Sequence, residues 1–363
     1  MFATALLADI LANDHPIAAV YPDRVYFPAL STADRFATRG LGPAEWALWP
    51  PVRFSASTTD LAQSGQKPLV RPPRGAARHL LGTDHIGRDT LAGLINGTRV
   101  AVFVGIGSLI ISLLIGLPLG AVAGFFGNSG LELSRAHRLA IGMGTVLGIM
   151  YAVACLLPLL GFGPLFALML LLSVAVMIAL LGVLLTPLRR KFGWWRKPGG
   201  VPLDWLVLLI LELVVSIPGL VLLIAILTFV DRPPLYLLVV IIGLLGWTPV
   251  ARFLRAELLR IRELPYIAAA RIGGVGELRL LVRHALPNAL PPVVVVASFM
   301  VGSSILAEAM LSFLGIGVPA DQVTWGSLLQ ESRSSPNSWW LAVFPGLLLT
   351  LTVLSCNSLR RSG

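Results

Sequence analysis

Charged residues are scarce in this chain, and their scarcity excludes an ordinary soluble domain. Only 13% of the 363 residues are charged, whereas 56% are hydrophobic, and the mean hydropathy is +0.83. A soluble domain of this length needs a much larger polar surface to face water. We therefore expect most of the chain to face the lipid bilayer or other membrane helices.

The sequence also lacks the residues that common catalytic and cofactor sites need. It has no Gly-x-x-x-x-Gly-Lys-Ser/Thr loop, so it does not hydrolyse ATP by the usual route. Its two cysteines, Cys155 and Cys356, both lie inside apolar runs, which argues against a disulfide or a metal site. No nucleophile and base stand together in the pattern of a membrane-bound enzyme. We expect a non-catalytic chain with no cofactor or metal of its own.

The net charge of +10 does not indicate binding to nucleic acid, because the basic residues lie in short loops between apolar runs. Lys and Arg are concentrated in the loops 188–200 and 253–287, and they are rare in 231–234 and 314–338. In membrane proteins, loops rich in these bases face the cytoplasm. This pattern places the two basic loops and the C-terminus in the cytoplasm, and residues 13–98 outside.

Seven apolar runs are long enough to cross a bilayer, which takes about 20 residues. They predict an all-α polytopic helical bundle with crossings near residues 99–124, 139–162, 164–187, 205–230, 235–252, 291–313 and 339–358. The first twelve residues are also apolar, but they are too few to cross alone. Two interpretations of residues 1–12 stay open: the end of a partial first transmembrane helix, or a short interfacial anchor.

Residues 13–98 are rich in proline, aromatic and polar residues, and they predict an irregular extracytoplasmic lobe. At the end of this lobe Asp84 is a plausible N-cap, and Asp89–Arg99 predicts an amphipathic helix that enters the membrane. The Asp-His-Arg-Asp cluster of this segment could instead form a catalytic or metal site. We favour the capped and salt-bridged start of a helix.

Residues 266–288 form a basic, helix-capable stretch between two apolar runs. Three small residues, Ala268, Ala269 and Ala270, are followed by Gly274 and then by Leu286-Pro287. They predict a short helix near 264–276 whose small side can lie close in a groove of another protein, and glycines that turn the chain. Leu280, Leu281, Val282 and Leu286 are expected to pack against the bundle, and Arg279 and Arg283 to stay solvated. The basic amphipathic pattern alone favours binding to lipid headgroups.

Several motifs carry a resemblance to a known family. The spacing of Ala268, Gly274 and Pro287 resembles the cytoplasmic "EAA" loop of bacterial ABC importer permeases. Further matches are Gly82-Thr83-Asp84 with Gly87-Arg88-Asp89, Ser216-Ile217-Pro218 with Glu212 upstream, the stretch 305–318, and Thr324-Trp325-Gly326. Over residues 80–127 and 204–358 the chain resembles the C-type permease subunit of dipeptide, oligopeptide and nickel importers.

The resemblance implies a permease transmembrane domain made of residues 99–127 and 204–358. It also implies import of peptides or a related small solute across the bacterial inner membrane. The implied partners are a homologous permease subunit, two ATPase subunits that bind ATP and Mg, and an extracytoplasmic solute-binding protein. The ATPase-coupling residues would be Ala268, Ala269, Ala270, Gly274, His284, Leu286, Pro287 and Asn288, with Asn288 as a turn or cap residue. The alternative is a secondary transporter or channel without an ATPase partner, but the sequence shows neither a transmembrane acid–base relay nor a broken-helix inverted repeat.

The chain departs from the family pattern in four places. Ala268 stands where the family normally has Glu, Glu212 stands where an Asp is usual, residues 128–203 are an insertion, and the N-terminal crossing is expected to be truncated. We interpret the insertion as a transmembrane hairpin with a basic cytoplasmic loop, peripheral to the translocation bundle.

Four charged residues are candidates for the pathway or its gate: Glu308, Glu212, Asp89 and Arg88. Glu308 is the most costly of them, because it is a carboxylate within an apolar run. We lean towards a hydrogen bond between helices for Glu308 over a role in the path. Gly116, Gly120 and Gly124 recur every four residues and predict close helix packing.

Overall fold

The computed structural model describes the chain with gaps between the described stretches. The described residues are 1–22, 24–38, 44–71, 77–127, 132–134, 140–141, 143–144, 147–148, 151, 164–185, 198–200, 203–228, 230, 233–319 and 322–358. They group into two compact units. The first comprises Met1–Pro118, Leu211–Leu254 and Asn288–Gly363, and the second comprises Leu119–Ile210 and Arg255–Pro287.

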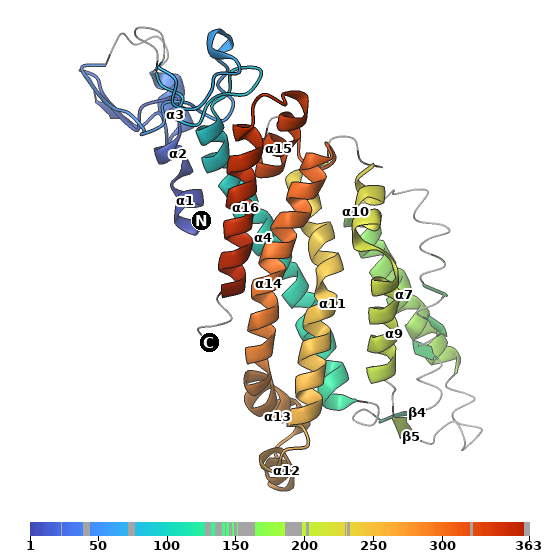
Figure 1. Cartoon of the computed structure of the whole chain (residues 1–363). Coiled ribbons are helices and arrows are strands. Elements are labelled where there is room, and N and C mark those ends of the chain that lie inside the picture. Colours follow the sequence, from blue (N-terminus) through green and yellow to red (C-terminus); the bar gives the residue numbers. More distant parts are fainter. Residues whose placement is uncertain are drawn as a thin grey trace. The chain divides into compact units, whose positions relative to one another are not determined.

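Among the residues that the structure describes, four helices are long and apolar enough to cross a membrane, which confirms the all-α membrane fold (Figure 1). They are α4 (Thr90–Ala121, continued to Phe126 by the π-helical turn η2, Val122–Phe126), α11 (Leu235–Ile261), α14 (Leu286–Phe313) and α16 (Trp340–Ser358). The crossing expected near 99–124 and the entry helix before it are one continuous helix.

The crossing expected over 205–230 is not one straight helix. Helix α9 (Leu203–Ser216) and helix α10 (Gly219–Thr228) meet at an angle of 71°. The break falls on Ser216-Ile217-Pro218, where proline has no N–H to donate and disfavours a helical conformation in the residue before it. The segment therefore consists of two short apolar helices, and its crossing of the bilayer as one bent span stays a prediction.

Small residues bring α4 and α11 close together in the first unit. A Cβ atom at Gly116 would lie 2.8 Å from the carbonyl oxygen of Trp247, and one at Gly243 would lie 2.7 Å from the Cβ atom of Ile111. Between these contacts, the Ser112 hydroxyl donates a 2.8 Å hydrogen bond to the Gly243 carbonyl. The close packing predicted at Gly116 is confirmed.

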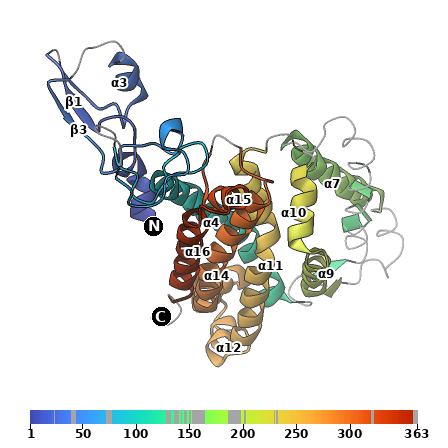
Figure 2. The same cartoon turned by 45° about the horizontal axis from the view of Figure 1, so that its top comes forward.

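The N-terminal part of the first unit is a small mixed lobe (Figure 2). Three strands form an antiparallel sheet in which β1 (Ala18–Val20) lies between β2 (Val25–Tyr26) and β3 (Trp46–Leu48). A salt bridge joins Arg99 of α4 to Asp9, with Nη2 2.7 Å from Oδ2. Residues 1–12 contain two short helices, so the choice between a partial crossing and an anchor stays a prediction. The elements are α1 (Phe2–Leu6), α2 (Ala8–Leu11), β1 (Ala18–Val20), β2 (Val25–Tyr26), α3 (Thr32–Ala37), β3 (Trp46–Leu48) and the 3-10 turn η1 (Leu61–Gln63).

The second unit contains the described parts of the insertion. Strands β4 (Glu132–Ser134) and β5 (Pro198–Gly200) pair antiparallel and bring the two ends of the insertion together. Helix α7 (Pro164–Leu184) packs on described residues of the preceding apolar run, 139–162. Cβ atoms at Gly144 and Gly148 would lie 2.7 Å and 2.5 Å from the Cα atoms of Ile178 and Val174. The order of these contacts along the chain is that of an antiparallel hairpin. The basic stretch 189–197 and most of the run 139–162 lie outside the described residues.

Candidate functional site

The predicted ATPase-coupling loop contains a short helix whose ends are well defined. Helix α12 (Pro265–Ile272) begins with proline at its first position, where no N–H is needed. Its end is a Schellman motif: the Gly274 N–H donates to the Arg271 carbonyl at 3.1 Å, and the Val275 N–H donates to the Ala270 carbonyl at 3.1 Å. Gly274 has φ +81°, the left-handed conformation that this motif requires.

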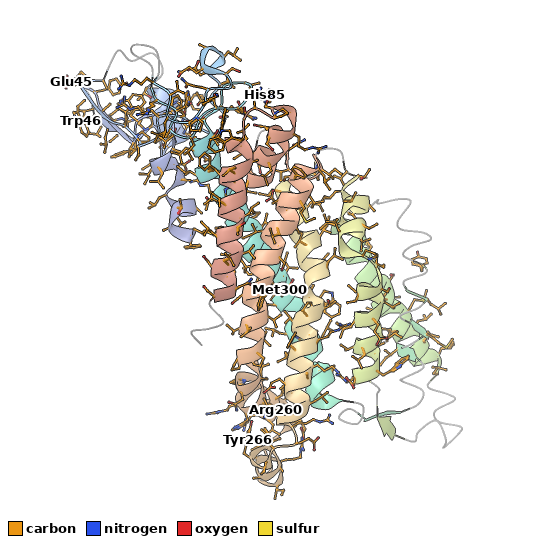
Figure 3. All side chains as sticks on the ribbon, viewed as in Figure 1. Glu45, Trp46, His85, Arg260, Tyr266 and Met300 are labelled. Atoms are coloured by element: carbon orange, nitrogen blue, oxygen red, sulfur yellow. The ribbon has the colours of Figure 1, made fainter. Side chains whose placement is uncertain are left out.

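Helix α12 carries a mixed surface of small and apolar side chains. Ile267 is fully buried and fixes the helix to the second unit, whereas Ile272 is 88% exposed and Tyr266, labelled in Figure 3, is 42% exposed. Ala268 and Ala269 are exposed, and Ala270 is half-buried. The small residues are therefore accessible, as docking into a groove requires.

The arm after α12 buries one side and exposes the other. Helix α13 (Glu277–Leu280) continues through the π-helical turn η5 (Leu281–Ala285) into α14. Leu280, Leu281 and Ala285 are buried, but Val282 is 56% exposed and Leu278 is 68% exposed. The expectation that Val282 packs against the bundle is therefore wrong.

The end of the predicted coupling loop is part of a long helix. Leu286, Pro287 and Asn288 are the first residues of α14, and the helical path from Glu277 to Phe313 is unbroken. Proline does not restart the chain there, and Asn288 is not a turn or cap residue. The widened turn η5 lies just before Pro287, where the missing N–H removes one helical hydrogen bond. His284 is half-buried within η5.

At the start of α4, Asp89 and not Asp84 is the N-cap residue. Asp89 caps α4, because its carboxylate accepts a 2.7 Å hydrogen bond from the Ala92 N–H, and it also lies 2.8 Å from Nδ1 of buried His79. Asp84 instead closes the turn before the helix by accepting the Ile86 N–H at 3.0 Å. The N-cap assignment to Asp84 is therefore wrong, because the cap lies five residues later, at Asp89.

Arg88 joins this turn to helix α15 (Trp325–Ser334). Its guanidinium pairs with Asp84, with Nε 2.6 Å from Oδ2, and with Glu331 of α15. The cluster lies beside a polar cavity of about 280 Å³, whose wall includes Arg88, Glu331, Ser327 and Gln330. Side-chain ligand atoms of Asp84, His85 and Glu331 also lie within 4.8 Å of one another, but both acids already hold the guanidinium. The salt-bridged interpretation fits better than a metal site.

The two carboxyl groups of this cluster differ in acidity. Burial raises the pKa of Glu331 to about 7, and the nearby Asp84 carboxylate adds to the rise against the opposing effect of Arg88. Burial alone would also raise the pKa of Asp84, but its hydrogen bonds and ion pair with Arg88 together lower it. Arg88 therefore sits between an ionised Asp84 and a Glu331 that retains a proton more readily than usual.

The raised pKa of Glu331 predicts a pH-dependent stability. The folded state holds this proton more tightly than the unfolded chain, so the contribution is complete below pH 4.5 and is lost as the pH rises through about 7. We expect the melting temperature of the purified protein to fall over that interval, and to fall less in Glu331→Gln. An equal pH response in the two proteins would contradict the assignment.

Helix α15 is fastened to the first unit by several buried contacts. The Trp325 indole N–H donates to the Leu94 carbonyl of α4 at 2.9 Å, and Thr324 and Ser327 form a reciprocal capping box. Gly326 lies directly against Ala309 of α14. Helix α15 is therefore an integral part of the first unit.

The candidate pathway residues lie in different surroundings. Glu308 is 2% exposed and accepts a 2.6 Å hydrogen bond from Ser312 on its own helix, which favours a packing role. Glu212 is exposed on α9. Asp89 and Arg88 lie in the turn that directly precedes α4. The structure does not bring these four residues together.

A cavity that the sequence did not reveal lies among α10, α11 and α14 of the first unit. Its volume is about 360 Å³, and its mostly apolar wall includes Met300, Met310, Ser304 and the backbone of Gly219 and Gly246 (Figure 3, with Met300 labelled). Methionine side chains adapt their shape to varied apolar groups. Gly219 lies in the cavity wall and directly follows the helix break at Pro218. In the sequence, this proline was the one residue that could have indicated the break and the cavity beside it.

Comparisons with known proteins agree with the sequence motifs. Residues 192–361 match the model of the family described as binding-protein-dependent transport system inner membrane component. A putative peptide transport system permease protein of Brucella suis is 37% identical, over 51% of this chain and 60% of that protein. The inner membrane ABC transporter permease protein YejE of Escherichia coli is 26% identical over 98% of this chain and 86% of its own length. The di/tripeptide transport system permease protein DppC of Pseudomonas aeruginosa is 29% identical over 80% and 73%.

The extent of these matches differs between relatives. The chain spans about 60% of the length of the Brucella relatives that it matches at 37% identity. The longer alignments, to the Escherichia and Pseudomonas proteins, include the N-terminal lobe and the insertion or large parts of them. With its apolar helices, the chain is a multi-pass inner-membrane protein. Residues 192–361 are a domain of the family of binding-protein-dependent transport system inner membrane components, and the relatives that match the chain are ABC-type peptide permeases.

Proposed function

We propose that this chain is one transmembrane half of an ATP-driven importer for peptides or a related small solute. It would pair with a homologous permease subunit, receive cargo from an extracytoplasmic solute-binding protein, and couple to two separate ATPase subunits that bind ATP and Mg. The observation that carries the proposal is the exposed apolar surface of α12 and α13, which a water-facing loop has no reason to keep unless a partner covers it.

The orientation belongs to the same proposal. The basic loops 188–200 and 253–287 face the cytoplasm with the C-terminus, and residues 13–98 and 314–338 lie outside, because Lys and Arg mark cytoplasmic loops. The ATPase would then meet α12, and the binding protein would meet the surface that contains α15. The insertion, residues 128–203, would be a peripheral hairpin.

A single charge in the apolar surface tests ATPase docking. We expect Ile272→Asp to weaken binding of the ATPase to the purified permease pair several-fold, because a buried carboxylate without a partner is costly. Leu61→Asp is the matched control, since Leu61 is 76% exposed but lies in the N-terminal lobe. The measurement is the ATPase dissociation constant, together with peptide uptake in cells.

Uptake in the absence of the ATPase decides between this proposal and a secondary transporter or channel. An ATP-driven importer loses uptake when the ATPase subunits are deleted. Undiminished uptake there, with wild-type ATPase binding by Ile272→Asp, would contradict the proposal.

A further inference from the structure

Every carboxylate of the coupling loop is paired with an arginine of the same loop. The three pairs are Glu257–Arg260, Glu263–Arg262 and Glu277–Arg271. The last pair is bidentate, with distances of 2.6 Å and 3.1 Å, and links α12 to α13 across the glycine turn. A fourth arginine, Arg255, pairs with Asp204. The loop therefore offers no unpaired carboxylate to a partner.

Two arginines are left over in this balance. The loop 255–287 contains six arginines, and four of them are in the pairs above. Arg279 and Arg283 are exposed, and neither forms an ion pair with any residue that the structure describes. They are the free charges of the coupling loop.

These two arginines lie beside the exposed apolar residues. Residues four apart on a helix are neighbours on one face, so Leu278 and Val282 form one row, and Arg279 and Arg283 form the row next to it. The opposite side of this arm is buried, with Leu280 and Ala285 both fully inaccessible. The docking surface, defined as Tyr266, Ile272, Leu278 and Val282 with Arg279 and Arg283, is thus apolar with a basic border.

We infer that the ATPase receives this surface in an apolar groove bordered by carboxylates, and that Arg279 and Arg283 form the ionic part of the contact. The inference rests on the proposed function and adds the chemistry of the partner surface. Ala268 occupies the position where the family normally has Glu, so the loop lacks the acid that would meet a basic ATPase residue. The polarity of the charged contact is reversed: the permease supplies the cations.

Charge complementarity selects a protein groove of this kind over an uncharged one. Two unpaired guanidinium groups on one border would be left beside an apolar wall, whereas carboxylates opposite them provide hydrogen-bonded ion pairs. Because the border remains near solvent, these pairs should depend on ionic strength, while the contacts of Ile272 and Leu278 should not.

The test compares charge variants of the complete permease pair. The ATPase dissociation constant is measured with the permeases in nanodiscs of neutral lipid and, separately, in nanodiscs that contain anionic lipid. We expect Arg279→Glu with Arg283→Glu to weaken binding about tenfold or more, because like charges then face each other. Arg252→Glu is the matched control: Arg252 is an exposed arginine of α11 that lies before the loop and has no ion pair among the described residues.

A milder variant covers failure of the charge-reversed protein to assemble. Arg279→Gln with Arg283→Gln removes the charges and keeps side chains that can form hydrogen bonds. Its ATPase affinity should change less than that of the wild type between about 0.1 M and about 1 M salt, because fewer ion pairs are screened. An identical salt response in the two proteins would overturn the inference.

The outcomes separate this inference from the proposed function. If both double variants of Arg279 and Arg283 bind the ATPase as the wild type does while Ile272→Asp weakens binding, the ATPase docks by apolar contact alone. The inference then fails. If none of the loop variants changes ATPase binding, the proposed function fails as well. If the arginine variants lose binding only in discs that contain anionic lipid, the cations bind lipid headgroups and the inference is overturned.

Discussion

Replacing Gly326 with alanine is expected to destabilise the folded protein by about 3 kcal/mol, a large effect for a single methyl group. A Cβ atom at Gly326 would lie 2.4 Å from the Ala309 carbonyl oxygen and 2.8 Å from the Ala309 Cα atom. Both atoms belong to the backbone of α14, so no side-chain rotation relieves the overlap. Helix α15 must move away from α14.

The movement would also disturb contacts distant from residue 326. The buried hydrogen bond from Trp325 to Leu94 and the ion pair between Glu331 and Arg88 both depend on the position of α15. An unpaired buried indole N–H or guanidinium adds its own cost. The expected result is a lower melting temperature and a lower yield of purified protein.

Gly346→Ala is the matched control for this prediction. Gly346 lies inside α16, and an added Cβ atom there meets nothing within 4 Å. Because alanine favours helix more than glycine does, this change should be neutral or stabilise by about 0.5–1 kcal/mol. Equal melting temperatures for the two variants, measured in the same detergent, would show that α15 is not held against α14 as described.

The long helices could be predicted from the sequence because their signal is strong and local. The run 339–358 agrees with both ends of α16 within one residue, and the run 291–313 agrees with the end of α14, which begins five residues earlier, at Leu286. Length and hydropathy alone determine such segments. The same reasoning failed at 205–230, where the composition is apolar throughout but a single Pro218 bends the path.

Polar contacts were harder to predict, because they depend on which residues the fold brings together. Asp84 and Asp89 are both good helix caps by residue type, and only the turn between them decides which one caps α4. Glu331 was not a candidate from the sequence, since its partner Arg88 is 243 positions away along the chain. A carboxylate on the amphipathic helix α15 indicates no site by itself. Its role becomes visible only when the fold places Arg88 beside it.

The coupling loop shows the same limits at smaller scale. The glycine turn and the small residues of α12 follow from local sequence, and α12 lies within the predicted range 264–276. Grouping Val282 with Leu280 and Leu281 was wrong, because two residues along a helix turn the side chain by about 200°, away from buried Leu280. The pairing of Glu277 with Arg271 also required the folded turn, whereas Glu257 and Glu263 pair with arginines close by in the sequence.

A leucine at position 274 is expected to reduce the affinity of the ATPase about tenfold, while the permease still inserts into the membrane. Gly274 has φ +81°, and a leucine held there costs about 1–2 kcal/mol. The chain can relieve this strain by giving up the Schellman motif. Helix α12 then turns away from the arrangement in which Ile272 and the small residues face the partner together.

Gly274→Asn provides the comparison that separates strain from bulk. Asparagine is similar in size to leucine but tolerates the left-handed conformation, and it also serves at this position of helix ends. An added Cβ atom at residue 274 meets nothing within 4 Å in this chain, so neither variant is crowded by the permease itself. If backbone shape matters, Gly274→Asn keeps much more of the ATPase affinity than Gly274→Leu. Copurification of the ATPase with Gly274→Leu at wild-type yield, with normal peptide uptake, would remove this loop from the coupling role, because the strained turn is the feature that presents the whole docking surface.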